Sequence, residues 1–196
     1  MTMNFIDPGE LRLSGQNPYM MVYDQPDAAA PSTLASIWHV QYCPEGGPGN
    51  VLFLRSQDLT DGICRVYADN IRLARWIQEE ITTPNQPWAD ATLPVAEATF
   101  ETEGDPRSYL TERIESREDD ISLTWYDFLP AFAGSTAPNP DRGSSHGHYA
   151  VYIPAKRVRV TLNGVECKGG PLPRQREGWE NSSCFLAWAE SWVRPK

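Results

Sequence analysis

The sequence is poor in the residues and motifs on which many enzyme families depend. It has only 3 histidines and 4 cysteines in 196 residues. It contains no GxSxG elbow, no Walker phosphate loop, no GxGxxG that opens a helix and no HExxH pair. The cysteines are Cys43, Cys64, Cys167 and Cys184, and their spacing matches neither a CxxC redox pair nor a zinc knuckle. We therefore expect reduced, partly buried thiols, and none of the enzyme classes that these motifs define.

Positive charge is also scarce, because 17 Lys and Arg stand against 26 Asp and Glu and leave a formal net charge of -9. A phosphate backbone or an anionic membrane surface would on average repel such a chain, so we expect neither nucleic acid nor membrane as a partner. Nowhere do about 18 apolar residues follow one another, and the opening segment MTMNFIDPGELRLSG lacks a basic stretch followed by an apolar run. We expect a cytoplasmic protein.

Short alternating segments dominate what the chain does contain. At 196 residues and 40% hydrophobic content, it is long enough to form one core, which predicts a single β-rich domain over residues 1–196. Pro, Gly, Asp and Asn punctuate the alternating segments, as expected between strands. The predicted strands are Tyr19–Tyr23, Ser36–Tyr42, Val51–Arg55, Ile63–Ala68, Val95–Thr102, Ser108–Ser116, Ile121–Phe128, His148–Ile153, Val158–Leu162 and Cys184–Val193.

One segment, DNIRLARWIQEEI, has helical periodicity. Ile71, Ala74 and Ile77 fall near one face, and Asp69 is a plausible N-cap because its carboxylate can accept from first-turn amides. With no regular alternation of strands and helices, the pattern argues against a doubly wound nucleotide-binding sheet. We predict a mainly β fold, an antiparallel barrel or a curved two-layer sheet, with one α-helix that plugs or flanks it.

A hairpin is predicted in KRVRVTLNGVECKGG. Asn163-Gly164 is the pair that a two-residue type I′ turn prefers, and the flanking residues alternate between apolar and polar. One face of the first strand is basic, with Lys156, Arg157 and Arg159. These side chains are a solvated face that protects an edge strand, or alternatively an anchor for an acidic group on a substrate or partner.

The segments ISLTWYDFLP and HGHYAVYIP, separated by a loop and followed by the hairpin, resemble lipocalin-like, calycin-type barrels, including cofactor-free phenolic acid decarboxylases. The resemblance lies in the order of the elements and covers only part of the chain, which lacks a Gly-x-Trp near its start. It implies an up-and-down barrel whose mouth holds a small apolar or aromatic ligand.

Histidines carry the first candidate site. His146 and His148 are two residues apart, so on a strand they share a face, and His39 is the third histidine. Together with a carboxylate these three residues suit zinc or iron, as in cupin-like enzymes. Without a metal, His39 and His148 suit acid–base work, since histidine titrates near neutral pH. The Ala133–Gly147 loop, which bears His146, is long enough to control access.

A second constellation combines aromatic and polar side chains that pockets commonly use. We predict His39, His148, Tyr126 and Asp127 as catalytic residues. The predicted substrate-binding residues are Trp38, Tyr67, Asn70, Trp125 and Tyr152. The alternative is that these residues form a core with hydrogen-bonded polar tips.

Two charged strands are a third candidate. Glu97, Glu101 and Glu103 line one side of the first strand, and Arg113 and Glu115 line one side of the second. They form a solvated sheet face, or a set of buried pocket groups if the sheet closes with this face inward.

The function that these patterns favour is a cofactor-independent lyase, such as a decarboxylase, or an isomerase that acts on a small aromatic compound. One alternative is a protein that only binds a small hydrophobic ligand, and another is a metal-dependent cupin-like enzyme that uses His39, His146 and His148. Exposed strand edges would also permit a homodimer.

Overall fold

A computed structural model of the chain describes residues 9–60, 62–84, 86–176 and 178–195. These residues are mainly β, as predicted, with one α-helix and one short 3₁₀ helix. The elements, in chain order, are β1 (Glu10–Gln16), β2 (Tyr19–Tyr23), β3 (Thr33–Tyr42), β4 (Gly49–Ser56), β5 (Ile63–Ala68), α1 (Ile71–Glu80), β6 (Val95–Asp105), β7 (Tyr109–Ser116), β8 (Asp120–Phe128), β9 (Phe132–Thr136), η1 (Pro140–Arg142), β10 (Gly147–Leu162), β11 (Val165–Glu166), β12 (Gly170–Pro171), β13 (Pro173–Arg176), β14 (Trp179–Ser182) and β15 (Cys184–Arg194).

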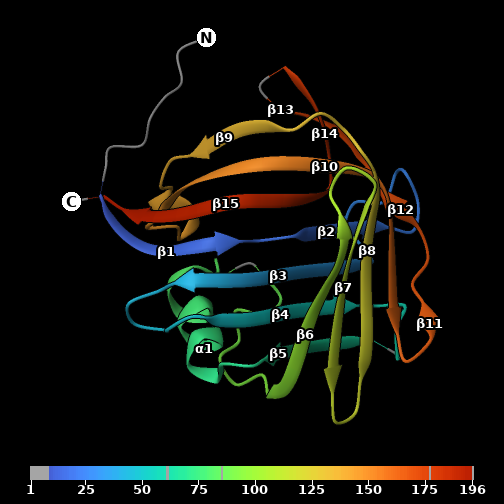
Figure 1. The fold of residues 1–196 in the computed structure, drawn as a ribbon, viewed down its shortest axis with the longest axis horizontal. Helices are drawn as coiled ribbons and strands as arrows, with labels where there is room; N and C mark the ends of the chain where they lie inside the picture. The colour runs from blue at the N-terminus through green and yellow to red at the C-terminus, as the bar shows by residue number, and fades with distance from the viewer. Residues whose placement is uncertain (1–8, 61, 85, 177, 196) are drawn as a thin grey trace.

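The sheet curls until it closes on itself. Its hydrogen-bonded order runs from β10 through β8, β7, β6, β5, β4, β3 and β1 to β15, and β15 pairs again with β10. In Figure 1, β6, β7 and β8 cross β3, β4 and β5 at a steep angle, so the ring is flattened into two layers. This confirms the predicted fold class.

One pairing departs from the up-and-down order that the lipocalin-like resemblance implied. β5 and β6 pair in parallel, over Val66–Ala68 and Val95–Glu97, and α1 lies in the connection between them. Parallel neighbours need a crossover connection, and a helix is the usual one. The single predicted helix is therefore the element that allows the ring to continue from β5 to β6.

Strand β10 closes the ring by changing partners partway along its length. The sequence predicted two strands here, but Pro154 does not end the first one. Up to Pro154 the strand pairs with β15, and from Ala155 it pairs with β8. Because proline has no N–H to donate, it is a suitable point to leave one ladder and join another. The Pro154 carbonyl instead accepts from the Leu129 amide at 2.7 Å.

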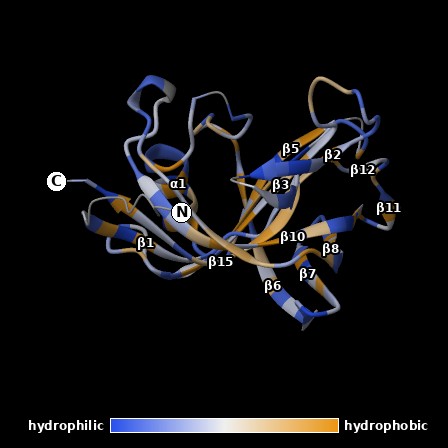
Figure 2. Ribbon diagram, turned by 90° about the horizontal axis from the view of Figure 1, so that it is seen from above, coloured by the Kyte–Doolittle hydropathy of each residue, from blue (hydrophilic) through white to orange (hydrophobic). Residues whose placement is uncertain are grey.

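Alternating side chains on β3, β4 and β5 supply two cores. One face packs against β6–β8 and includes Tyr67 and Trp125, and the other packs against α1 and includes Trp38. Figure 2 shows α1 and β6–β8 on opposite sides of these strands. Consecutive residues on β3 therefore point into different cores, which decides where each predicted site residue lies.

The helix begins one residue later than its predicted cap suggests. Asn70, not Asp69, is the N-cap, and its side chain accepts from the Leu73 amide at 3.2 Å. Asp69 is instead bonded to Asn50 on β4. Leu73 and Ile77 are buried as the periodicity predicts, but Ile71 is 46% exposed.

Several shorter predictions are also settled. The two-residue hairpin is confirmed, because Leu162 pairs with Val165 and both Asn163 and Gly164 have positive φ. The predicted Ala133–Gly147 loop contains most of β9 and the 3₁₀ helix η1. All four cysteines are free.

Residues 1–8, which begin the segment expected to lack an export signal, lie outside the described residues. Within the described part of the chain, no helix has the length and apolar character needed to span a membrane.

Candidate functional site

His39 lies on the inward face of β3, at one end of the core between the two layers. Register places it opposite Asn50 on β4 and opposite Gln16 on β1. Ile37, two residues earlier, faces the same core, whereas the adjacent Trp38 faces α1. The side chain of His39 is 18% exposed. One edge of this imidazole is therefore open, while the rest is enclosed by the ring.

Asn50 fixes the orientation of this imidazole. The Nδ1 atom of His39 lies 2.6 Å from the Asn50 Oδ1 atom. The Asn50 amide group donates through its own Nδ2 to Asp69 at 2.6 Å, and the Asn50 backbone donates to the same carboxylate at 2.7 Å. Because the amide nitrogen is committed to Asp69, the oxygen faces the ring, so Nδ1 of His39 is the donor. The Nε2 atom is left to face the interior.

Glu112 meets that Nε2 atom from the opposite layer. It stands on β7 between Leu110 and Ile114, and no part of it is exposed. Its Oε1 atom lies 3.0 Å from His39 Nε2, and its Oε2 atom accepts from Thr102 at 2.9 Å. The approach of His39 Nε2 to Glu112 Oε1 is close but does not have hydrogen-bond geometry. Neither of these two atoms has another hydrogen-bond partner among the described residues. The two atoms are thus neighbours that both retain capacity to bond a third group.

The charge of Glu112 determines the titration of His39. Burial alone would lower the pKa of His39, but the contact and the negative charge of Glu112 oppose burial, and the net pKa is raised. Asn50 and the more distant Asp69 act in the same direction. An opposite charge at this range favours the protonated imidazole. His39 is consequently held closer to its charged form at neutral pH than a free histidine.

Sequence reasoning identified His39 but missed Glu112. The sequence pattern points to the charged side of β7, with Arg113 and Glu115. Glu112 is on the apolar side, in the alternation Leu110-x-Glu112-x-Ile114. A carboxylate at a position where the strand pattern demands an apolar residue is the signal that would have found it. Such a position is costly for a charge, so it is retained only with a partner.

His148 lies on the other side of the sheet. Its ring stacks on Trp192 at 4.5 Å, Trp192 in turn packs on Trp38, and the Nε2 atom of His148 lies 3.0 Å from the Tyr152 hydroxyl. Burial, assisted by Arg176, lowers the pKa of His148 to about 4. The predicted aromatic surroundings of His148 are therefore present. However, the sheet separates His148 from His39, because Trp38 and His39 point in opposite directions.

Tyr126 and Asp127 make their contacts with Arg157 and not with either histidine. Asp127 is exposed and forms an ion pair with Arg157, and its φ of 51° interrupts the strand alternation. The ring of Tyr126 lies 5.8 Å from the same guanidinium. Trp125 and Asp127 are two residues apart and would share a face in a regular strand, but the positive φ turns the Asp127 side chain outward.

The remaining predicted binding residues have structural partners. Trp125 is fully buried and donates to the Tyr19 carbonyl at 3.3 Å. Tyr67 is fully buried and donates to Asp119 at 2.7 Å. Asn70 caps α1, and its amide nitrogen donates to the Gly46 and Pro48 carbonyls. For these residues the alternative interpretation, a core with bonded polar tips, describes their contacts.

His146 is 1% exposed rather than placed on an open lid. Its Nδ1 atom lies 3.0 Å from the Ser145 hydroxyl, and burial together with Arg194 lowers its pKa. Each histidine thus has its own surroundings, and the three do not meet. Among the described residues, no group of three or more His, Cys, Asp and Glu is arranged to hold a metal ion.

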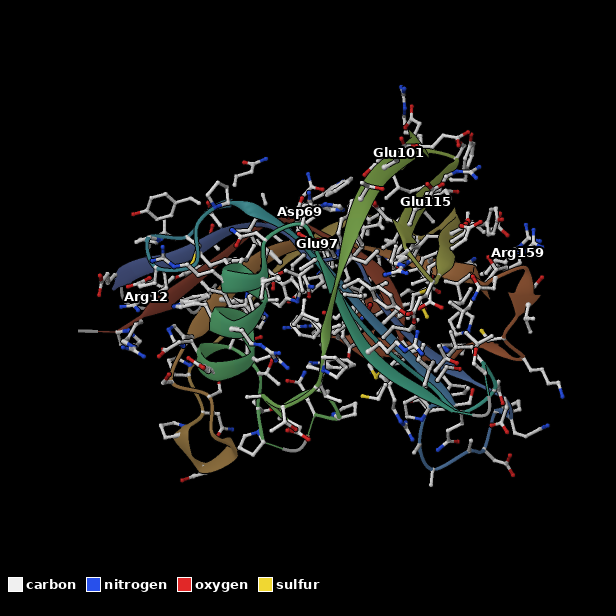
Figure 3. The ribbon with its side chains drawn as sticks, turned by 90° about the horizontal axis from the view of Figure 1, so that it is seen from below. Arg12, Asp69, Glu97, Glu101, Glu115 and Arg159 are labelled. Carbon is white, nitrogen blue, oxygen red and sulfur yellow. The ribbon has the colours of Figure 1, made fainter. Side chains whose placement is uncertain are left out.

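The charged strands β6 and β7 turn their acidic faces to solvent. Glu97, Glu101, Glu103 and Glu115 are exposed, and in Figure 3 Glu101 and Glu115 lie on the β6–β7 ribbon at the edge of the molecule. Arg113 is also exposed and contacts Glu103 at 3.4 Å. The solvated-face interpretation therefore holds for these side chains.

Two clefts lie elsewhere on the surface. One, which we call the hairpin cleft, has a volume of about 270 Å³ and lies between β10 and the β13–β14 hairpin. The other, of about 440 Å³, lies where β5 meets β6 and the β7–β8 turn. Neither cleft is lined by a predicted catalytic or substrate-binding residue, whereas Lys156 of the basic strand lines the first and Glu97 of the charged strands lines the second.

Comparison with known proteins adds little to this geometry. No protein-family model matches the chain, and no curated protein matches its sequence. Among solved structures, the chain is similar to an acetoacetate decarboxylase from Legionella pneumophila subsp. pneumophila str. Philadelphia 1, with a TM-score of 0.48 and 8% identity, over 100% of this chain and 88% of that one. A similarity of this size establishes neither a shared fold nor a shared activity.

Proposed function

We propose that the chain is an acid–base enzyme, a cofactor-independent lyase or isomerase for a small and preferably aromatic compound, with His39 and Glu112 as its catalytic pair. The observation that supports this is the bent 3.0 Å approach of His39 Nε2 to Glu112 Oε1, with neither atom bonded elsewhere among the described residues. A small oxygen or carbon acid placed beside both atoms would meet a proton donor and a proton acceptor together.

The roles follow from the two environments. His39 carries a proton on Nδ1 through Asn50, and its raised pKa favours a second proton on Nε2. In a decarboxylation, the bond to the leaving carbon dioxide breaks, and His39 delivers its Nε2 proton to the carbon that retains the electron pair. In an isomerisation, Glu112 removes a proton from carbon while His39 donates its Nε2 proton to the substrate oxygen. Glu112 then returns its proton at a second carbon, and the oxygen returns its proton to His39.

The structural alternative is a buried ion pair without catalytic use. Replacing such a pair by apolar residues is often neutral or stabilising, so burial by itself does not explain its presence. Three further polar groups, Asn50, Asp69 and Thr102, hold the two members in place. Positioning of this kind is what an acid–base site requires, because rate depends on a fixed geometry.

A turnover assay in deuterated water tests the proposal. Purified protein is incubated with hydroxylated cinnamic and benzoic acids, and NMR records loss of substrate, new vinyl or arene signals, and deuterium incorporated at carbon. We expect Glu112→Gln and His39→Gln to lower turnover by about 10²-fold to 10⁴-fold. His148→Gln is the matched control, since His148 lies across the sheet, and it should retain activity close to wild type.

Two results would contradict the proposal. Turnover that survives Glu112→Gln would remove the pair from the chemistry, and tight binding of these acids without turnover would favour a ligand-binding protein. An NMR titration of His39 gives an independent measurement. In Glu112→Gln the pKa of His39 should fall, because burial then acts without the opposing carboxylate.

A further inference from the structure

The hairpin cleft gathers positive charge in a protein whose formal net charge is -9. Lys156 from β10 and Arg174 from β13 both line it, together with one acidic residue, Glu180. The hairpin that forms one wall stands apart from the ring, beside β9 and β10 (Figure 1). This local excess of cations differs from the acidic surface of β6 and β7.

Lys156 is the unused member of the basic segment noted in the sequence. Arg157 forms an ion pair with Asp127, and Arg159 forms one with Glu166 at 2.9 Å. Lys156 is exposed, and among the described residues no hydrogen bond or ion pair involves its ammonium group. Its ammonium group is therefore available to an anion from outside the chain, while its two neighbours are engaged.

A hydrogen bond and the strand pairing hold Arg174 in position. Its guanidinium donates to the Tyr23 hydroxyl at 3.0 Å, and its backbone pairs with Asn181 across the hairpin. Ser183, at the base of the hairpin, anchors it to β2, because the Met21 amide donates to the Ser183 carbonyl at 3.0 Å and the Ser183 hydroxyl donates to the Met21 carbonyl at 2.6 Å. A guanidinium fixed on one side retains donors on the other, and its planar fork suits a carboxylate.

The rest of the lining is suited to an organic body. Leu129, Pro171 and Pro173 supply apolar wall, and the amide of Asn181 supplies a polar group. Pockets for small molecules combine an apolar wall with a few fixed polar groups in this way, and at about 270 Å³ the cleft is at the small end of the usual range.

We propose that the hairpin cleft binds a small organic carboxylate, whose charged end lies between Lys156 and Arg174 and whose apolar body lies against Leu129 and the two prolines. This site is separate from the His39 and Glu112 pair, so it stands or falls independently of the proposed activity. Inorganic anions lack the apolar body, and neutral isosteres lack the charge, so the two parts of the proposal are testable one at a time.

The experiment is an NMR titration of the labelled full chain with benzoate and with benzamide, its neutral isostere. We expect benzoate to shift the side-chain amide signals of Gln175 and Asn181 saturably, and benzamide to bind at least about tenfold more weakly, since bonds to charged groups contribute about 1.5 to 3 kcal/mol. Lys156→Gln should weaken benzoate at least about tenfold. Arg157→Gln is the matched control. It removes a positive charge from the next residue, whose side chain lies outside the cleft.

Four outcomes would overturn the proposal or one of its parts. Benzamide binding as tightly as benzoate would remove the role of charge, and unchanged affinity in Lys156→Gln would remove the role of this ammonium group. Shifts confined to residues around His39 would place the ligand in the ring instead. A comparison with inorganic phosphate tests the apolar wall, since phosphate that bound as tightly as benzoate would show that the wall contributes nothing.

Discussion

Glu190 is a second buried carboxylate, and its surroundings predict how the stability of the protein depends on pH. It is 4% exposed and follows Ala189, whose φ of 48° marks a bulge in β15. Its Oε1 atom accepts from the Trp192 indole at 2.9 Å, but its Oε2 atom has no partner among the described residues. Burial raises the pKa of Glu190 to about 8, and the single indole bond only partly opposes it.

The sign and size of the effect follow from linkage. Because the folded-state pKa is raised from 4.5 to about 8, Glu190 contributes stability that is fully present below pH 4.5 and is lost as pH rises through about 8. Each unit of difference between the two states is worth about 1.36 kcal/mol. Between about pH 5 and pH 8 the loss is therefore about 3 kcal/mol in the free energy of unfolding.

Glu190→Gln isolates this contribution. The amide keeps an oxygen for the Trp192 donor and does not ionise, while any penalty from its unpartnered N–H₂ group is the same at every pH. Guanidinium unfolding followed by tryptophan fluorescence, at about pH 5 and pH 8, should show the wild type losing about 3 kcal/mol more than the variant. Exposed Glu101→Gln is the control and should follow the wild type. Equal losses in wild type and Glu190→Gln would refute the reasoning, because Glu190 would then not titrate in this range.

Two further predictions concern His148 and Asn70. Since the pKa of His148 is lowered from 6.5 to about 4, the folded protein should lose stability as pH falls between these values. At about pH 4.5 the wild type should have lost about 2 kcal/mol more than His148→Gln. Urea unfolding at two pH values measures this difference. Asn70→Ala removes the cap of α1 and two bonds to the Gly46–Pro48 turn, so we expect a loss of about 1 to 2 kcal/mol in chemical unfolding, whereas Asn70→Asp should retain most of the cap.

The strands were predictable where alternation and turn chemistry agreed. β2 and β5 have the predicted bounds, and the Asn163-Gly164 turn sets the β10–β11 hairpin. β1 was missed, because its Gly15 resembles a break in the pattern. In the structure, a Cβ at Gly15 would lie 2.1 Å from the His39 carbonyl oxygen, so this glycine permits two strands to approach closely. A glycine of that kind cannot be distinguished from a turn glycine until the strand pairing is known.

The site was predictable only in part, for a topological reason. His39 was identified from its residue type, and its partner Asn50 lies directly before the next predicted strand, Val51–Arg55. Glu112 lies on β7, which is not a neighbour of β3, and the two meet only because the ring closes and brings its layers together. Strand periodicity gives the face of a side chain, but closure decides which opposite face it meets. The same limit explains why His39 and His148 were placed together.

Glu112 and Glu190 are buried carboxylates with different surroundings. Glu190 meets only a neutral indole, and the proton that burial holds on it removes the need for a partner. Glu112 meets a histidine whose pKa its proximity raises, and the pair lies inside a core of leucine, isoleucine and tryptophan. A fold that needed only stability could fill the position of Glu112 with an apolar residue at little or no loss. Polar groups of β4, of the β5–α1 junction and of β6 instead orient His39 and Glu112 toward each other, and the proposed proton transfer would use that arrangement.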